Sequence, residues 1–301
     1  MKKTIALIFA VSLFLAACKG APPPPDMENP GVGPALRVTI PDLFSPDPDI
    51  ADDTMTIAIA VVHPVPIKEW HIQIQPQRGG HGTGGQRQAG EARPAGEERQ
   101  EGRRRRAFFE QRGTGTVPEA WKWNGKGTSG EMVQSAMDYR FTLSVTDVFD
   151  NNSEYQGIIG VDVLVRREGD ILRIIVPSIV FPPNSSDFSL LSEDDRRSNT
   201  RIMTLIARAL NRFGDYAITI EGHANPTTRP NTANRRTEEA TELKPLSEAR
   251  AKAVLDSLAD NNHISRSRLS SVGIGGERTV AAYDNDDENW KNRRVEFILR
   301  R

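Results

Sequence analysis

The chain contains one cysteine, Cys18, among its 301 residues. An internal disulfide is therefore excluded, and so is a metal site built on two or more cysteine ligands. Charge of one sign is not in excess either. The 39 Lys and Arg against 40 Asp and Glu give a formal net charge of -1, which argues against a protein held to nucleic acid mainly by phosphate contacts. After the N-terminus, no apolar run approaches the ~20 residues that span a bilayer, so we expect no later membrane helix.

Catalytic and metal-binding motifs are also missing. The five histidines are scattered and form neither an H-E-x-x-H pair nor another ligand spacing, and no G-x-S-x-G nucleophile elbow is present. The acidic run from Asp284 to Glu288 lacks the spacing of an EF-hand. We therefore predict that the protein is not an enzyme and has neither a cofactor nor a resident metal.

The N-terminus has the pattern of a secretory signal. Lys2 and Lys3 precede an apolar stretch from Ile5 to Leu15, which is too short and wrongly flanked to be a lasting membrane span. The following Leu-Ala-Ala-Cys, residues 15–18, resembles a bacterial lipobox. The resemblance implies cleavage after residue 17, and diacylglycerol and acylation (a palmitate-type modification) on Cys18, with stable anchoring by several acyl chains. An ordinary signal peptide with a chance cysteine is the alternative. Lys19, by analogy with Gram-negative sorting, favours the outer membrane.

The remaining N-terminal part divides into a tether and a β-rich region. Residues 18–35 contain a proline run that favours extended polyproline II, so we predict a Pro/Gly-rich tether. From residue 36 to 168, short segments of alternating polarity predict an all-β sandwich, with strands at 54–62, 70–74, 139–145 and 160–165. Residues 77–106 interrupt it with Gly, Gln, Glu and Arg, which predicts a disordered hairpin insertion. Its four consecutive arginines, residues 103–106, belong either to a solvated loop or to a contact with an anionic surface.

Part of this β region resembles a known module. The run Trp121-Lys122-Trp123-Asn124-Gly125, with Gly127, Gly130, Tyr139, Asp147 and Asn151 after it, is similar to the immunoglobulin-like domain of flagellar hook-cap proteins. The likeness covers about forty residues. It implies an immunoglobulin-like spacer or binding module without catalytic residues.

Residues 169–301 alternate between strand and helix signals. Apolar segments at 171–181, 216–222, 268–272 and 295–299 predict strands, and residues 196–213 carry an apolar stripe at three- and four-residue steps that predicts a helix. A second helix is predicted over 247–261, with Ser247 as N-cap and Leu246 as hydrophobic staple. The order β-α-β-α-β-β predicts an α/β domain with its helices on one face of a sheet.

Four ordered motifs in this region resemble the OmpA-like domain of the OmpA C-terminus, peptidoglycan-associated lipoprotein and flagellar stator proteins. They are residues 220–225 (IEGHAN), 246–251 (LSEARA), 268–277 (RLSSVGIGGE) and 292–296 (NRRVE). The resemblance implies non-covalent binding of the peptidoglycan stem peptide. In the family, an Asp at the end of the first motif and the Arg of the second hold a diaminopimelate residue.

Carried onto this chain, the resemblance makes Arg250 the group for the ligand carboxylate and Asn225 the group for its amine, with His223 and Arg294 as further candidates. A guanidinium fork suits a carboxylate, and we expect Arg250 to lie one turn into its helix, where the helix dipole also favours an anion. Two positions depart from the family pattern: Asn225 replaces the Asp, and Leu243 stands where an Asn is common. Residues 226–244 also form an unusually long connection, and His223 and Arg294 have purely structural interpretations.

The sequence thus predicts a lipid-anchored outer-membrane protein, facing the periplasm, that tethers the membrane to peptidoglycan. The alternative is an OmpA-like scaffold that has lost its ligand and binds envelope proteins instead.

Overall fold

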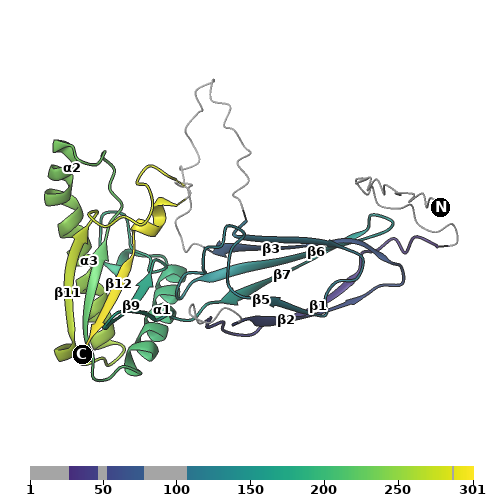
Figure 1. The fold of residues 1–301 in the computed structure, drawn as a ribbon, viewed down its shortest axis with the longest axis horizontal. Helices are drawn as coiled ribbons and strands as arrows, with labels where there is room; N and C mark the ends of the chain where they lie inside the picture. Colours follow the sequence, from purple (N-terminus) through teal and green to yellow (C-terminus); the bar gives the residue numbers. More distant parts are fainter. Residues whose placement is uncertain (1–26, 47–52, 78–106, 287) are drawn as a thin grey trace, which may run out of the picture.

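The computed structural model describes residues 27–46, 53–77, 107–286 and 288–301. Two regions follow one another along the chain: an N-terminal region of antiparallel sheets and a C-terminal α/β region (Figure 1). Within the described residues, no helix is both long enough and apolar enough to cross a membrane. Cys18 and the predicted signal and tether up to residue 26 lie outside the described residues, as does the insertion at 78–106.

Two antiparallel sheets form the N-terminal region. One has the strand order β1-β2-β5, from Ala35–Thr39, Met55–Val62 and Ala120–Trp123, and the other the order β4-β3-β6-β7, from Phe109–Thr114, Ile67–Gln77, Asp138–Asp147 and Asn152–Gly160. Every second residue of β2 and β6 is buried, as expected for strands with one face on a core. Large side chains from both sheets fill that core, including Ile57, Trp121, Ile72 and Phe141. The predicted all-β architecture is confirmed.

Two details of this region bear on the sequence predictions. Strands β3 and β4 flank the predicted insertion and pair with each other antiparallel, with Ile74 opposite Phe109. The strand predicted at 160–165 is wrong: β7 ends at Gly160, and Val161 forms only a single bridge to Phe44. The alternation that predicted a strand there reflects burial at the junction, because Val161, Asp162, Val163 and Leu164 are all buried.

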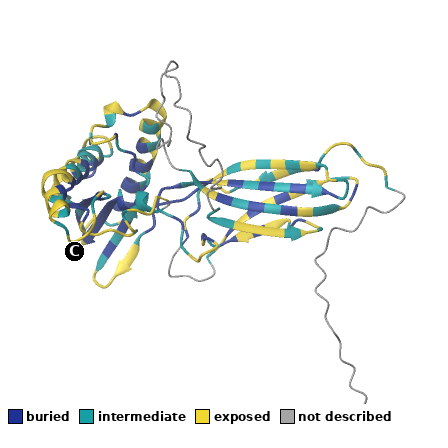
Figure 2. Ribbon diagram, turned by 90° about the horizontal axis from the view of Figure 1, so that it is seen from above, coloured by how far each residue is buried: buried dark blue, intermediate teal, exposed yellow. Residues whose placement is uncertain are grey.

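The C-terminal region is one five-stranded sheet with helices on one face (Figure 2). Its strand order is β11-β10-β12-β9-β8, from Leu269–Gly275, Ala217–His223, Val295–Arg300, Ile171–Val176 and Arg166–Glu168. The helices are α1 (Glu193–Asn211), α2 (Ala233–Glu238) and α3 (Lys244–Asp260), with a π-helical turn at Glu239–Leu243 and 3-10 turns at Phe188–Leu190, Arg266–Arg268 and Asn289–Asn292. From β9 onward the predicted order β-α-β-α-β-β is confirmed, and β8 adds a short edge strand.

Alternation along the strands decides which face meets the helices. Ile218 and Ile220 of β10 and Phe297 of β12 belong to the core shared with α1 and α3. The residues between them, such as Glu221 and Glu296, therefore point to the opposite face of the sheet.

The start of the second helix differs from the prediction. Ser247 is not an N-cap: α3 begins at Lys244, and the helical path continues back through the π-helical turn to α2 at Ala233. The Ser247 hydroxyl instead lies inside the helix, where it donates to the carbonyl of Lys244 and accepts from the N–H of Gly275. Arg250 consequently lies well inside a helical segment, so the predicted contribution of a helix N-terminus at Arg250 is wrong.

Side chains join the two regions directly. Arg201 of α1 donates to Asp138 of β6 at 3.0 Å, and Arg208 of α1 donates to Asp162 at 2.8 Å. Ala136 and Val163 pack into the C-terminal core, and Trp290 packs against the N-terminal core. The sheets of the two regions are therefore held in a defined relation to each other.

Candidate functional site

A cleft of about 1380 Å³ lies where the two regions meet. Its C-terminal side consists of the segment after β9, the start of α1, Arg250 of α3 and the turn around Arg293. Its N-terminal side consists of the adjoining ends of β3 and β6. Binding sites in proteins occur preferentially at such junctions, and this volume exceeds the range of about 300–1,000 Å³ that holds a drug-sized ligand.

Arg250 is the most informative residue of this cleft. Its side chain is buried, and its guanidinium donates to two backbone carbonyls, those of Pro182 and Ser185, at 3.1 Å each. It also lies 5.0 Å from the ring centroid of Phe181. No carboxylate in the described part of the chain pairs with it, so Arg250 does not neutralise one of the neighbouring glutamates there. Glu248 accepts from Ser271 instead, and Glu221 from Arg278.

A second arginine, Arg293, lines the same cleft. Burial lowers the pKa of Arg250 to about 10, with a further contribution from the positive charge of Arg293, and burial also lowers the pKa of Arg293. Among the described residues, neither arginine has an acidic partner. Two partly desolvated cations without a counter-charge favour an anionic ligand, because an unpaired buried charge is costly.

Asn225 lies in a different setting. Its amide nitrogen donates to the carbonyls of Pro226 and Tyr283, at 3.0 and 3.3 Å, and its side-chain oxygen accepts from Asn292 at 2.8 Å. It is not among the residues that line the cleft. Its polar atoms hold the loop before β12 in place, so they are engaged within the protein.

Much of the long connection after Asn225 is ordered into helix. Glu238 at the end of α2 accepts hydrogen bonds from the backbone and hydroxyl groups of Thr227 and Thr228. Arg235 donates to the carbonyl of Gly276. Leu243 is buried, with 6% of its surface exposed. This segment folds against the loop after β11, where Leu243 packs close to Gly276.

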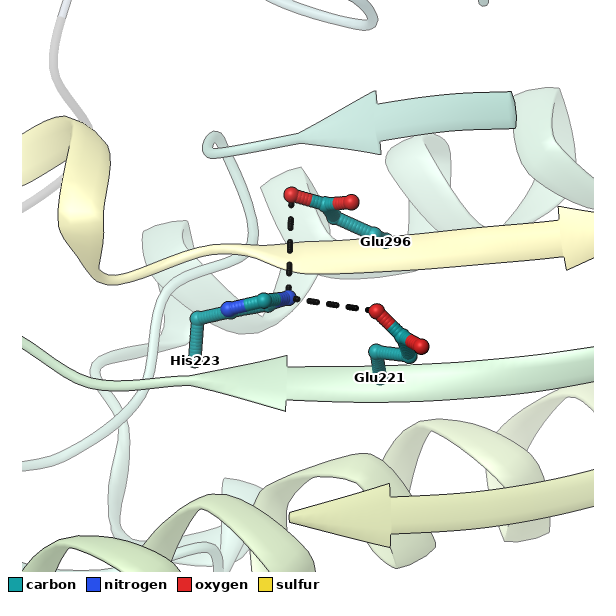
Figure 3. Close-up of side chains that lie close together, drawn as sticks. All are labelled: Glu221, His223 and Glu296. Carbon is teal, nitrogen blue, oxygen red and sulfur yellow. Dashed lines mark ion pairs between the residues drawn. The ribbon is translucent and has the colours of Figure 1, made fainter. Parts of the chain in front are cut away.

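His223 lies beside Glu221 and Glu296 in a buried cluster (Figure 3). Arg294 is buried too and belongs to the same cluster, because it pairs with Glu296. The His223 Nε2 atom lies 3.8 Å from Glu221 and 3.6 Å from Glu296, beyond hydrogen-bonding distance. Neither ring nitrogen has a hydrogen-bond partner in the described structure. Burial, followed by the charge of Arg294, lowers the pKa of His223 to about 4, so the ring is neutral at neutral pH.

The three side chains of Figure 3 could in principle bind a metal, because their ligand atoms lie within 4.8 Å of one another. Their surroundings do not suit a cation. Arg294 and Arg173 both donate to Glu296, and Arg278 donates to Glu221. Burial raises the pKa of Glu296, but Arg294, His223 and Arg173 together outweigh it, so the pKa stays below its usual value. Three arginines already neutralise two carboxylates, and we interpret the cluster as a structural ion-pair network.

The structure therefore separates the four candidate residues. Arg250 lines the cleft, Asn225 braces a loop, and His223 and Arg294 lie in the network on the other sheet face. The cleft residue that sequence reasoning did not select is Arg293, which directly precedes Arg294. Alternation could have indicated it, since neighbouring residues at the start of a strand point to opposite faces.

Comparisons with known proteins give a family match and several similar solved structures. The model of the family described as OmpA family matches residues 180–293. A putative MotB-like protein from Desulfovibrio vulgaris is 21% identical, over 46% of this chain and 79% of that one, with a TM-score of 0.36. The cell wall anchor of the T6SS from Pseudomonas aeruginosa is 22% identical, over 46% and 86%, with a TM-score of 0.34.

The peptidoglycan-associated lipoprotein from Burkholderia pseudomallei is 19% identical, over 42% of this chain and 94% of that one, with a TM-score of 0.29. A comparison with curated proteins finds no significant match. The family match covers the four sequence motifs up to Arg293. Residues 180–293 of this chain therefore form an OmpA family domain, a kind of domain that generally binds peptidoglycan and is generally non-catalytic.

Proposed function

We propose that this protein is a lipoprotein of the outer membrane that faces the periplasm and binds peptidoglycan stem peptide without covalent chemistry. Cys18 would carry the lipid, the β-sandwich would act as a spacer, and the OmpA family domain would hold the cell wall. The protein would thereby tether the membrane to the wall reversibly. It would not act as an enzyme and would not bind nucleic acid.

The observation that carries this proposal is that Arg250 is buried without an acidic partner among the described residues. Its guanidinium is desolvated, is oriented by the carbonyls of Pro182 and Ser185, and lacks a carboxylate among the described residues. The carboxylate of a stem peptide would supply the missing counter-charge through charge-assisted hydrogen bonds. Arg293 would add a second positive charge at the same cleft.

Two features of the N-terminal region support an immunoglobulin-like spacer. Tyr139 stands at the start of β6, and its hydroxyl accepts from the backbone N–H of Gln134 at 2.9 Å, which is the arrangement of a tyrosine corner. Trp70 of β3 is buried in the core between the sheets. Both are typical of immunoglobulin-like sandwiches, and seven strands in two antiparallel sheets fit the same class.

The position of the first described residues suits a spacer. Asn29 accepts a hydrogen bond from Asn151 at the turn between β6 and β7, whereas Asp138 at the other end of β6 contacts Arg201. The chain thus enters the sandwich at the end far from the OmpA family domain (Figure 1). A lipid on Cys18 would leave the full length of the sandwich between the membrane and the cleft.

The test is co-sedimentation of the full chain, purified in detergent, with purified peptidoglycan. We expect the wild type to pellet with the wall and Arg250→Ala to remain in the supernatant. Arg250→Lys keeps the charge but loses the planar fork, so it should bind weakly rather than not at all.

The matched control is Arg266→Ala, an exposed arginine that pairs with Asp256 and Asp260 away from the cleft. It should pellet like the wild type. Circular dichroism of each variant checks that the domain is folded. If the wild type itself stays in solution, peptidoglycan binding is refuted.

A scaffold that binds envelope proteins is the second candidate, and the environment of Asn225 favours it. All polar atoms of that side chain are engaged within the protein, so the amine-binding group of the family has no free counterpart at this position. A folded wild type that fails to pellet with peptidoglycan, yet retains envelope proteins after cross-linking, would support this candidate.

A further inference from the structure

The cleft has a second wall that does not belong to the OmpA family domain. The side chains of Gln75, Gln77 and Arg140, from the ends of β3 and β6, line it opposite Arg250 and Arg293. We call these three residues the sandwich wall. Gln75 pairs directly across the strands with Arg140, and Gln77 pairs with Asp138, so all of them lie on the same outer face of the sheet.

The polar groups of the sandwich wall have no partner among the described residues. Within the described ranges of the chain, the side chains of Gln75, Gln77 and Arg140 form neither a hydrogen bond nor an ion pair, and Gln75 and Arg140 are exposed. Two amides and a guanidinium offer donors and acceptors to a ligand rich in hydroxyl and amide groups.

The two walls are fixed relative to each other. The Arg201–Asp138 and Arg208–Asp162 hydrogen bonds cross the junction, and the hydroxyl of Ser178 donates to the carbonyl of Ser135 at 3.3 Å. Asp138 itself lines the cleft between the sandwich wall and α1. A ligand held by Arg250 would therefore meet the sandwich wall in a constant position.

The size of the cleft sets a requirement on its ligand. A single diamino acid is smaller than a drug-sized molecule, and the cleft of about 1380 Å³ exceeds the usual range for such molecules. The cationic part, Arg250 and Arg293, lies in the C-terminal domain, and the sandwich wall lies across the cleft from it. Three carboxylates, Asp138, Asp195 and Asp286, also line the cleft. A ligand that fills it would bring carboxylates to Arg250 and Arg293 and polar groups to the amides and the guanidinium of the sandwich wall.

We propose that the cleft binds a peptidoglycan fragment with its sugars attached, so that Arg250 and Arg293 hold the carboxylates of the stem peptide and the sandwich wall contacts the disaccharide. This inference rests on the proposed function and adds to it that the N-terminal region takes part in recognition. The protein then recognises the point where the stem peptide joins the glycan, and full affinity for this fragment needs both domains.

The experiment compares two probes by isothermal titration calorimetry on the full chain. One is the free tripeptide that ends in diaminopimelate, and the other is the same tripeptide with its disaccharide. We expect the disaccharide tripeptide to bind about ten-fold tighter or more, as added hydrogen bonds from the amides and the guanidinium of the sandwich wall would provide. The double variant Gln75→Ala/Arg140→Ala should remove that difference and leave the affinity for the free tripeptide within two-fold.

The matched control is Gln156→Ala/Arg112→Ala, which removes the same residue types from exposed positions elsewhere on the same sheet. It should behave as the wild type. Equal affinity for the two probes, or a sugar-dependent gain that survives in Gln75→Ala/Arg140→Ala, overturns this inference and leaves the proposed function standing. If neither probe binds, the proposed function fails as well.

Discussion

Four buried or half-buried arginines of the C-terminal domain differ in what accompanies their charge. Arg173 and Arg294 share Glu296, and their ion pairs stabilise the sheet. Arg250 and Arg293 have no acidic partner among the described residues, and burial lowers the pKa of both. Since an uncompensated buried charge costs stability, its presence at a cleft is better explained by a ligand than by folding.

The sequence motif led to Arg250 but chose Arg294 in place of Arg293. Arg293 and Arg294 directly precede β12 and are chemically alike, so the motif could not choose between them. Only the alternation of side chains into the strand indicates that they point to opposite faces. Similarly, the motif assigned the ligand amine to Asn225. It could not indicate that Tyr283 and Asn292, more than fifty residues later, would occupy that amide.

The neutral His223 makes the stability of the domain depend on pH. Its pKa is about 4 in the folded protein, against an ordinary value near 6.5, so between these values the unfolded chain binds more protons. Stability should therefore fall as the pH falls below about 6.5. We expect a loss of about 2 kcal/mol between pH 7 and pH 5 in urea unfolding at constant ionic strength.

The matched variant is His223→Gln, which fills similar space without titrating in this range. It should flatten the dependence between pH 7 and pH 5. The groups that face the ring are Glu221, Glu296, Arg173, Arg278 and Arg294, and the neighbouring arginines hold the pKa of Glu296 below its usual value. An unchanged slope in His223→Gln would assign the dependence to another group.

At the level of elements, periodicity predicted α1 well because it has one apolar face, and the apolar residues of β10 and β12 indicated those strands although β12 is buried on both faces. It failed at α3. Pro245 lacks a backbone N–H, and Ser247 is a common N-cap, so local rules place a helix start there. The chain instead continues the helix through a π-helical turn at Glu239–Leu243, which accommodates the missing hydrogen bond. Packing against β11, not a local signal, fixes that path.

Gly222 lets α3 approach the sheet closely. A Cβ atom there would lie 2.0 Å from the backbone oxygen of Ser247, so Gly222→Ala must push α3 away from β10. We expect the variant to lose about 1–3 kcal/mol of stability. Because Arg250 lies one turn beyond Ser247, the shift should also weaken co-sedimentation with peptidoglycan.

Gly214→Ala is the control, since its Cβ would meet nothing within 4 Å. Its free energy of unfolding should stay within about 0.5 kcal/mol of the wild type. A Gly222→Ala variant as stable as Gly214→Ala would show that α3 can shift without cost, and the argument that the glycine fixes the position of Arg250 would be wrong.

At the level of the whole molecule, sequence reasoning predicted two regions of the right classes but not their relation. The contacts that fix it, such as Arg201 to Asp138, join residues far apart in the chain and carry no local pattern. The cleft exists only because of that relation. Each region alone offers only part of its lining, and the smaller part comes from the N-terminal region, so the second wall could not be derived from the OmpA-like motifs.

Weakening the contacts between the two regions should therefore affect binding of the free tripeptide and binding of the disaccharide tripeptide differently. In Arg201→Ala/Arg208→Ala, the hydrogen bonds to Asp138 and Asp162 are lost. Since partly exposed ion pairs contribute about 0.2–1 kcal/mol each, unfolding should change little. Small-angle X-ray scattering should show a broader distribution of domain arrangements, because fewer contacts then hold the two regions together.

The same double variant should keep most of its affinity for the free tripeptide, because Arg250 and Arg293 are unchanged, although Arg201 also lines the cleft. Its extra affinity for the disaccharide tripeptide should fall, because the sandwich wall is no longer held in place. Arg197→Ala/Arg212→Ala, which removes two arginines from α1 and its C-cap without touching the junction, should keep that affinity. If Arg201→Ala/Arg208→Ala also keeps the extra affinity for the disaccharide tripeptide, binding of the sugars does not depend on the sandwich wall, and the OmpA family domain binds the ligand alone.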